Sequence, residues 1–208
     1  MKKYVSYLLI IIHLFFTGFS GLTYHSPSAY SSFWGEIFNY DAQDINADGN
    51  PATGEPSNGA LVDHWQEVIA SHTWSQVTSS RQPMYNTWSI SNRYPGVTFD
   101  GSNDMLEVLD HSDINLSETY SEKSFWIVLE TGADIISLQT IYEQWHHEKW
   151  YGFQISNGHL YGWVWNTVDW APGDQRKIID YGAINTNTDY FITLIHDNTQ
   201  VTGYLDGT

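Results

Sequence analysis

Residues 150–166, WYGFQISNGHLYGWVWN, constrain the fold of this chain more than any other stretch. At their centre stands Asn157-Gly158, a pair typical of type I′ hairpin turns, because both central residues of such a turn have positive φ. A turn at this pair predicts an antiparallel hairpin in which the numbers of facing residues sum to 315. Strand side chains alternate between faces, so one face of the hairpin, on which Ile155 faces Leu160 and Phe153 faces Gly162, is expected to be core surface.

The other face of the predicted hairpin is also aromatic, although a sheet needs only one apolar face to fold. One interpretation is that other parts of the chain cover this face, since large aromatic side chains are usually buried. The alternative is an open platform, because flat rings suit the apolar faces of sugars while amides and carboxylates bind sugar hydroxyls. The candidate carbohydrate-binding residues are Trp150, Gln154, Tyr161, Trp163 and Trp165, with Gly152 beside Trp163 and with Asn166 and Asp169 as nearby polar groups.

The first 20 residues have the pattern of a secretory signal peptide. Lys2 and Lys3 form a positive start, residues 8–16 are mostly apolar, and Gly18 and Ser20 are small residues at the −3 and −1 positions of a cleavage site. The apolar run is short for a membrane span, and a retained N-terminal anchor is the alternative. We therefore expect a secreted or cell-surface protein with no membrane span in the mature chain, and a flexible lead-in at residues 21–35.

Acidic residues outnumber basic residues, and the formal net charge is −16 at pH 7. Nucleic acids and anionic membranes are bound by basic surfaces, so neither is an expected partner. The charge is compatible with cation binding and equally with a role in solubility. The chain has no cysteine, which excludes disulfides and thiol chemistry, so the exported domain has to depend on its aromatic-rich core.

Residues 41–59, DAQDINADGNPATGEPSNG, consist largely of turn-forming residues and contain the spacing of a calcium loop. In such a loop, oxygen ligands at alternate positions converge on one ion, a glycine permits a sharp turn, and a distal glutamate closes the shell. Pro51 and the flanking segments do not fit a helix-flanked EF-hand, which leaves a free-standing calcium loop or an ordinary acidic turn cluster. The candidate calcium ligands are Asp44, Asn46, Asp48, Asn50 and Glu55.

The remainder of the chain has turn signals between short apolar or alternating runs, and no sustained helical periodicity. Residues 61–68 are compatible with a short helix or a strand. Strands are expected at residues 97–99, 105–108, 125–130, 140–143, 190–196 and 201–205, with loops at 144–149 and 170–175 and a tight turn at 197–198. Short strands separated by turns predict an all-β, antiparallel sandwich or barrel.

Two motifs stand at opposite ends of the predicted strands: Phe99-Asp100-Gly101 with Asp104 and Leu106, and late in the chain Tyr204-Leu205-Asp206-Gly207. In their order and spacing they resemble the LamG-like, concanavalin A-like lectin/glucanase superfamily. The resemblance implies a jelly-roll β-sandwich over residues 36–208. In that family further strands follow the late hairpin, so the resemblance also implies that the last strands are missing and that the chain is part of a longer multidomain protein.

The superfamily includes glycoside hydrolases, whose two carboxylates lie on one strand face as E-x-D-x-E or E-x-D-x-x-E. Retaining hydrolysis needs such a pair roughly 5–5.5 Å apart. Glu130 with Asp134 and Glu107 with Asp110 do not fit this spacing, and we expect no enzyme activity. The favoured hypothesis is a module that binds a glycan or cell-surface polysaccharide, with a structural or protein-interaction domain as the alternative and a hydrolase as the third.

Overall fold

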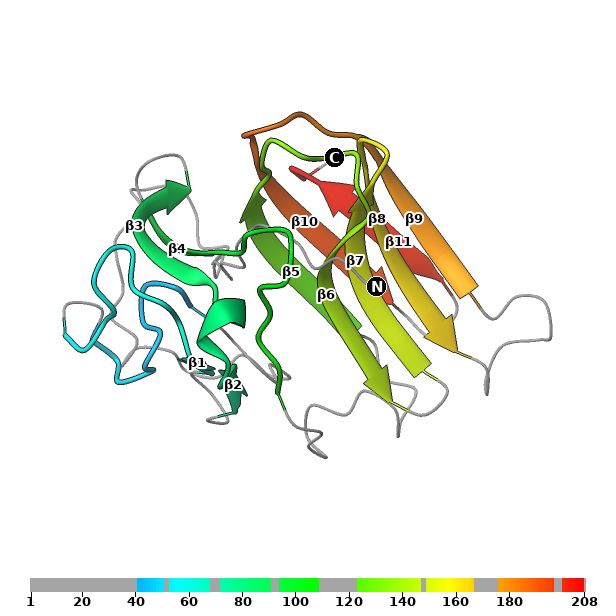
Figure 1. Ribbon diagram of the computed structural model, residues 1–208. Helices are drawn as coiled ribbons and strands as arrows, with labels where there is room; N and C mark the ends of the chain where they lie inside the picture. The colour runs from blue at the N-terminus through cyan, green and yellow to red at the C-terminus, as the bar shows by residue number, and fades with distance from the viewer. Residues whose placement is uncertain are drawn as a thin grey trace, which may run out of the picture.

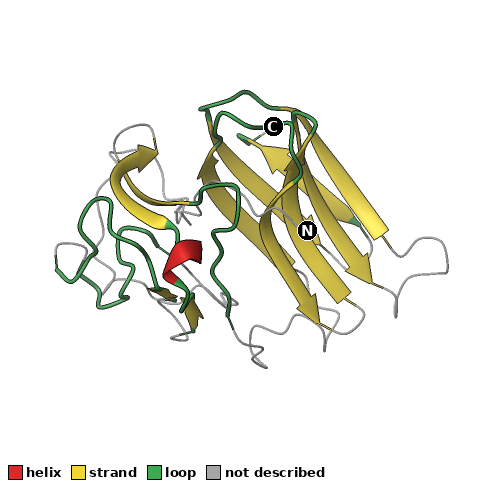
Figure 2. Ribbon diagram, viewed as in Figure 1, coloured by secondary structure: helices red, strands yellow, loops and turns green. Residues whose placement is uncertain are grey.

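The computed structural model describes residues 41–50, 53–67, 72–90, 94–108, 123–146, 149–166, 176–196 and 200–207. Nearly all of the regular structure in these ranges is β-strand, with one short 3-10 helix, which confirms the all-β prediction (Figure 2). The expected signal peptide, the lead-in at 21–35, the loop at 170–175 and the turn at 197–198 lie outside the described residues. The elements are β1 His64–Gln66, β2 Thr73–Ser75, η2 Ser79–Arg81, β3 Met84–Ile90, β4 Tyr94–Thr98, β5 Lys123–Glu130, β6 Gln139–His146, β7 Lys149–Ser156, β8 His159–Asn166, β9 Arg176–Ala183, β10 Asp189–His196 and β11 Val201–Leu205.

Two antiparallel sheets pack face to face and form a sandwich (Figure 1). One sheet has the order β6-β7-β8-β9, and the other has the order β11-β10-β5. The main core lies between them, because alternate residues of both sheets point inward. Its buried members are Phe125, Ile127, Leu129, Tyr142, Tyr151, Phe153, Ile155, Leu160, Val164, Ile184, Tyr190, Ile192 and Leu194.

The hairpin of β7 and β8 has the register that the Asn-Gly turn predicts. Asn157 has φ 53° and Gly158 has φ 77°, and Phe153 faces Gly162 while Ile155 faces Leu160. The turn is held from both sides, because Asn157 N donates to the carbonyl of residue 136 at 2.9 Å and Gly158 O accepts from the backbone N of Ile184 at 2.9 Å. The turn residues and the apolar pattern together specify this register.

One local prediction needs correction, and one strand was not predicted. The loop expected at residues 144–149 is wrong, because β6 continues to His146 and β7 begins at Lys149, with Gln144 facing Tyr151 across the ladder. Strand β9, Arg176–Ala183, was not predicted at all. It is the edge strand of its sheet and is charged at its start, so its sequence lacks the apolar density of a central strand.

At one edge of the sandwich, the Tyr181 side chain of β9 joins the two sheets. Its ring lies over Gly162 of β8 and Gly203 of β11, where a Cβ would come within 3.1 Å and 2.6 Å of ring atoms. Its hydroxyl donates to the carbonyl of Thr193 on β10 at 2.8 Å. Two glycines therefore make room for one large side chain that contacts both sheets.

A lobe built from β1–β4 and the loops around them lies beside β5 (Figure 1). It has its own core, to which Val128 of β5 belongs and against which Phe191 of β10 packs. Trp74 packs against both this core and the main one. The other buried members of the lobe core are Ala42, Ile45, Val62, Trp65, Tyr85, Val97 and Leu106.

The first motif of the family resemblance forms a compact turn. Asp100 Oδ1 accepts the backbone N–H groups of Ser102, Asn103 and Asp104 at 2.8, 3.0 and 3.2 Å, and Asp104 Oδ2 accepts that of Asp100 at 2.8 Å. Partial burial acts to raise the pKa of Asp100, but these three N–H groups outweigh it and lower the pKa below its ordinary value. Asp100 and Asp104 thus have a structural role at this turn.

The second motif of the resemblance ends β11. Asp206 has φ 51°, its Oδ1 accepts the backbone N of Phe191 at 2.8 Å, and its own backbone N donates to the carbonyl of Phe191 at 2.8 Å. The aspartate therefore fastens the end of β11 to β10. The strand expected at residues 105–108 is reduced to one bridge between Ser75 and Glu107.

Candidate functional site

The outward face of the four-stranded sheet brings the predicted platform residues together. Residues 161, 163 and 165 of β8 alternate with core residues and therefore point away from the sandwich interior. Their partners on β7 are Gln154, Gly152 and Trp150, and their partners on β9 are Asp180, Ile178 and Arg176. The predicted candidates thus share one face, although the side chain of Trp150 lies outside the described residues.

Among the rings of this face that the structure describes, Trp163 is the most buried, with 6% of its surface exposed. It lies over Gly152, where a Cβ would come within 2.6 Å of Cη2 and 2.7 Å of Cε2. On its other side, Ile178 of β9 is 51% exposed. The glycine predicted to leave room for Trp163 does so, and this ring packs as part of the structure. Tyr161, Trp165 and Gln154 are only partly buried.

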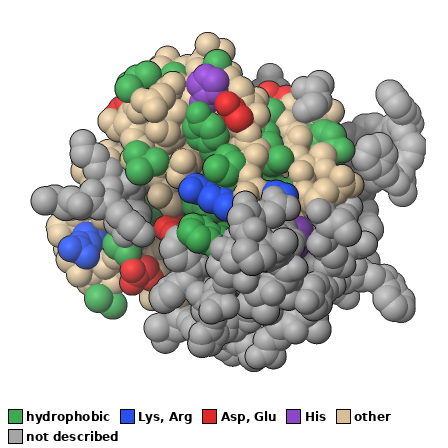
Figure 3. Space-filling model, turned by 90° about the vertical axis from the view of Figure 1, so that its right-hand side faces the viewer, with side chains coloured by type: hydrophobic (Ala, Val, Ile, Leu, Met, Phe, Trp, Pro, Cys, Tyr) green, Lys and Arg blue, Asp and Glu red, His purple; other side chains and the backbone are tan. Residues whose placement is uncertain are grey.

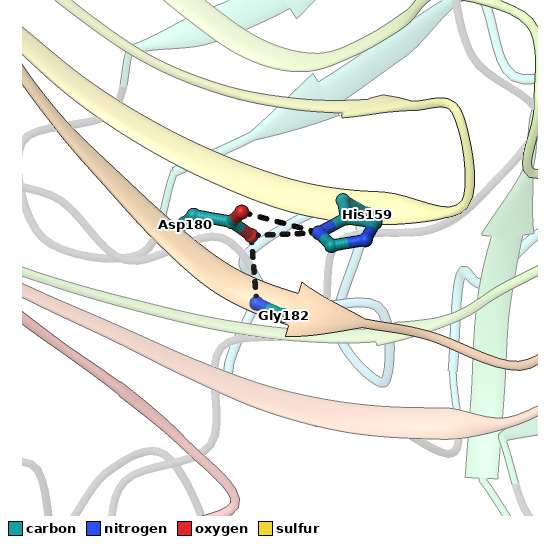
Figure 4. Close-up of polar contacts among 3 residues, drawn as sticks. All are labelled: His159, Asp180 and Gly182. Carbon is teal, nitrogen blue, oxygen red and sulfur yellow. Dashed lines mark hydrogen bonds and ion pairs between the residues drawn. The ribbon is translucent and has the colours of Figure 1, made fainter.

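Next to the tryptophans, β8 and β9 hold an open cluster of His159, Tyr161 and Asp180. The rings of His159 and Tyr161 are stacked, with centroids 6.0 Å apart and an interplanar angle of 19°. His159 Nδ1 lies 3.0 Å and 3.1 Å from the two carboxylate oxygens of Asp180, and Gly182 N donates to Oδ1 at 2.8 Å (Figure 4). The side chains of His159 and Asp180 remain 39% and 49% exposed.

The Asp180 carboxylate is charged at neutral pH. The hydrogen bond from His159 is the main reason that its pKa is lowered, and the N–H of Gly182 and the charge of His159 act in the same direction. Figure 3 shows the side of the molecule on which β9 lies, with histidine and acidic side chains near the top, hydrophobic side chains below them and basic side chains further down. The cluster therefore combines flat rings with a fixed, accessible anion.

Sequence reasoning missed Asp180 and did not single out His159. Asp180 lies 21 residues after His159, on a strand that was not predicted. Only the alternation of β9, recognised as the next strand after the hairpin, could have placed this carboxylate beside Tyr161.

The predicted calcium loop is folded around Asp44. This carboxylate is 1% exposed, and its Oδ1 and Oδ2 accept the backbone N–H groups of Asp48 at 3.0 Å and Gly49 at 2.9 Å. Asn46 Oδ1 also accepts from Asp48 N, and Asn50 N donates to Asp48 Oδ1 at 2.8 Å. Backbone N–H groups therefore bind several of the side-chain oxygens that were expected to coordinate an ion.

Glu55, the last of the predicted calcium ligands, closes the loop. Its Oε2 accepts the backbone N–H of Ile45 at 2.9 Å, while its Oε1 is buried and has no hydrogen-bond partner among the described residues. Burial raises the pKa of Glu55 to about 7, with the charges of Asp44, Asp48 and Asp41 adding to the rise and the N–H of Ile45 opposing it.

The residues of this loop fit calcium in their chemistry, because calcium takes carboxylate and amide oxygens. Within the described ranges, however, no group of three or more His, Asp or Glu side chains is arranged to hold a metal ion. Calcium binding at Asp44, Asn46, Asp48, Asn50 and Glu55 thus stays a prediction.

The fold and this face define an all-β sandwich protein with a mixed aromatic and acidic sheet surface. Comparisons of the chain with protein-family models, with curated proteins and with solved structures found no match. The resemblance to LamG-like domains, including the jelly-roll topology, therefore stays a prediction. Among the described residues there is no helix with the length and hydrophobicity needed to cross a membrane.

Proposed function

We propose that this protein is a non-catalytic carbohydrate-binding or adhesion module of an exported protein, acting at the cell surface or outside the cell. The observation that supports this proposal is the cluster on the outward sheet face, where the stacked rings of His159 and Tyr161 lie beside the fixed carboxylate of Asp180. The glycan is expected to lie across β7, β8 and β9.

The chemistry of the cluster suits a sugar in two respects. The C–H faces of a pyranose are apolar and pack on aromatic rings such as the partly buried ring of Tyr161. Sugar hydroxyls need hydrogen-bond acceptors and donors, which the carboxylate of Asp180 and the amide of Gln154 supply on either side of that ring. A rigid sheet holds these groups in place without ordering a loop.

The second candidate is a structural or protein-interaction domain, and the burial of Trp163 favours it. A ring that is 6% exposed contributes to packing and offers little surface to a ligand. The two candidates differ in their demand on Tyr161, because only a glycan-binding module needs this ring for its function.

A polysaccharide pull-down and a glycan array test the proposal with the wild type, Tyr161→Ala and a matched control, Tyr204→Ala. Tyr204 lies on β11 in the other sheet and is 40% exposed. The proposal predicts binding by the wild type and by Tyr204→Ala, and an affinity at least roughly tenfold lower for Tyr161→Ala. No binding by the folded wild type, or equal binding by all three proteins, would contradict it.

A further inference from the structure

The charges around the aromatic row of β8, formed by Tyr161, Trp163 and Trp165, are unevenly distributed. Asp180 on β9 lies beside Tyr161, and the exposed Glu143 of β6 faces Gly152, so carboxylates lie on both flanks of the row. The exposed Arg176 is at the other end of β9, opposite Trp165. The rings of His159 and Tyr161 therefore lie beside a carboxylate, whereas the arginine lies beside Trp165 at the other end of β9.

We infer that this face selects glycans that carry a protonated amine, such as glucosamine polymers, over neutral glycans and over polyanionic ones. The inference rests on the proposed function and specifies its ligand. It follows from the position of Asp180, the orientation of its carboxylate and the ring next to it.

The carboxylate of Asp180 is fixed but not saturated. His159 Nδ1 and Gly182 N hold its two oxygens, at 3.0 and 3.1 Å and at 2.8 Å respectively. A carboxylate has about four lone-pair sites, so acceptor capacity remains on a side chain that is 49% exposed. An ammonium group can thus bind to Asp180 without breaking either existing contact.

An amine bound to Asp180 would also lie near an aromatic face. Tyr161 is the direct cross-strand partner of Asp180, and directly paired residues on one sheet face have Cβ atoms about 5 Å apart. A cation within about 6 Å of an aromatic centroid is attracted by the electrons of the ring. The sugar ring that carries the amine can therefore stack on Tyr161 while its substituent reaches the carboxylate.

The charge of the whole chain acts in the same direction. With a formal net charge of −16, the protein repels polyanions such as uronate or sulfated glycans and attracts polycations. This general attraction has to be separated from recognition by Asp180. The separation requires a second carboxylate that can be neutralised elsewhere on the surface.

The experiment compares four β-1,4-linked oligosaccharides of equal length. They are oligomers of glucosamine, N-trimethylated glucosamine, N-acetylglucosamine and glucose. Isothermal titration calorimetry measures their affinities for the wild type, for Asp180→Asn and for a control, Glu107→Gln. Glu107 is exposed and lies in the β1–β4 lobe, so both variants remove one negative charge. The trimethylated ligand carries its charge independently of pH.

We expect the wild type and Glu107→Gln to bind the glucosamine oligomer roughly three- to fivefold more tightly than the two neutral ones. The trimethylated oligomer has no N–H to donate to Asp180 and should show a smaller gain, from its charge alone. Asp180→Asn should lose this preference except for the small part that the net charge of the whole chain produces, a part that Asp180→Asn and Glu107→Gln share. A wild type that binds all four equally, or an Asp180→Asn variant whose preference equals that of Glu107→Gln, would overturn the inference and leave the proposed function standing. If the folded wild type binds none of the four and no glycan on an array, both the inference and the proposed function fail.

Discussion

The contact between Trp163 and Gly152 predicts that one substitution changes sign with its background. In the wild type, Gly152→Val would place a Cβ within 2.6 and 2.7 Å of two atoms of a ring that is 6% exposed. The ring has to move, and overpacking of this kind costs about 1–3 kcal/mol of unfolding free energy. Trp163→Ala alone removes a buried ring, and we expect it to cost about 3–5 kcal/mol.

In the Trp163→Ala background, the same Gly152→Val change meets no ring. Valine also has a higher β-strand propensity than glycine, so we expect Gly152→Val to stabilise the Trp163→Ala variant by about 0.5 kcal/mol. The coupling between the two sites is then about 1.5–3.5 kcal/mol, which is large for neighbouring residues. If the Trp163 ring did not pack on Gly152, the effect of Gly152→Val would not change sign between the two backgrounds.

Urea unfolding followed by far-ultraviolet circular dichroism measures the four proteins of this cycle without relying on tryptophan fluorescence. Tyr204→Ala serves as the control background, because Tyr204 is 40% exposed on the other sheet. In that background Gly152→Val should cost as much as in the wild type. Additive effects of Gly152→Val and Trp163→Ala, within about 0.5 kcal/mol, would refute the packing argument.

Three further predictions concern the loops. The pKa of Glu55 is raised to about 7, so the stability that its protonated form contributes is present below its ordinary pKa of 4.5 and is lost as the pH rises through about 7. Glu55→Gln, which still accepts from Ile45 N, should match the stability of the wild type near pH 5 and exceed it by about 1 kcal/mol near pH 8 in urea unfolding with chelator. An equal difference at both pH values would contradict this. If calcium binds the loop, it should raise the melting temperature of the wild type but not of Asp44→Ala or Asp48→Ala in scanning calorimetry, and a wild type indifferent to calcium and chelator would leave only a turn cluster. Asp100→Ala leaves three backbone N–H groups without their acceptor and should lower the unfolding free energy by about 1–3 kcal/mol, while an unchanged urea midpoint would show that water replaces the carboxylate.

The hairpin of β7 and β8 could be predicted to the residue because its determinants are local. Two turn residues with positive φ and an alternating apolar pattern allow only one pairing register for the two strands. Strands β5, β10 and β11 could be predicted for the related reason that apolar and β-branched residues are dense there. Local composition failed at β9, whose charged and half-buried edge sequence, RKIIDYGA, resembles a loop.

The candidate site depended on information that is not local. Both faces of β8 carry large apolar side chains, so the sequence could not tell that Trp163 is buried while Tyr161 is partly open. The partnership of His159 with Asp180 requires the pairing of β8 with β9, which brings together residues 21 positions apart. The acidic loop illustrates a further limit, since its spacing specified a turn but not whether carboxylates or backbone N–H groups fill it.

The side chain of Tyr181 has a consequence for how this sandwich can vary in evolution. Its ring requires glycine at position 162 on β8 and at position 203 on β11, and its hydroxyl requires the carbonyl on β10 to stay in place. The residues that one tyrosine contacts therefore lie on strands of both sheets, and their sizes depend on one another. A larger residue at position 162 needs a smaller one at position 181, and a larger residue at position 203 also needs a smaller one at position 179, because Ile179 Cγ2 would lie 2.6 Å from its Cβ. Homologues of this chain should therefore change these four positions as a set, and their covariation would trace the edge at which the two sheets meet.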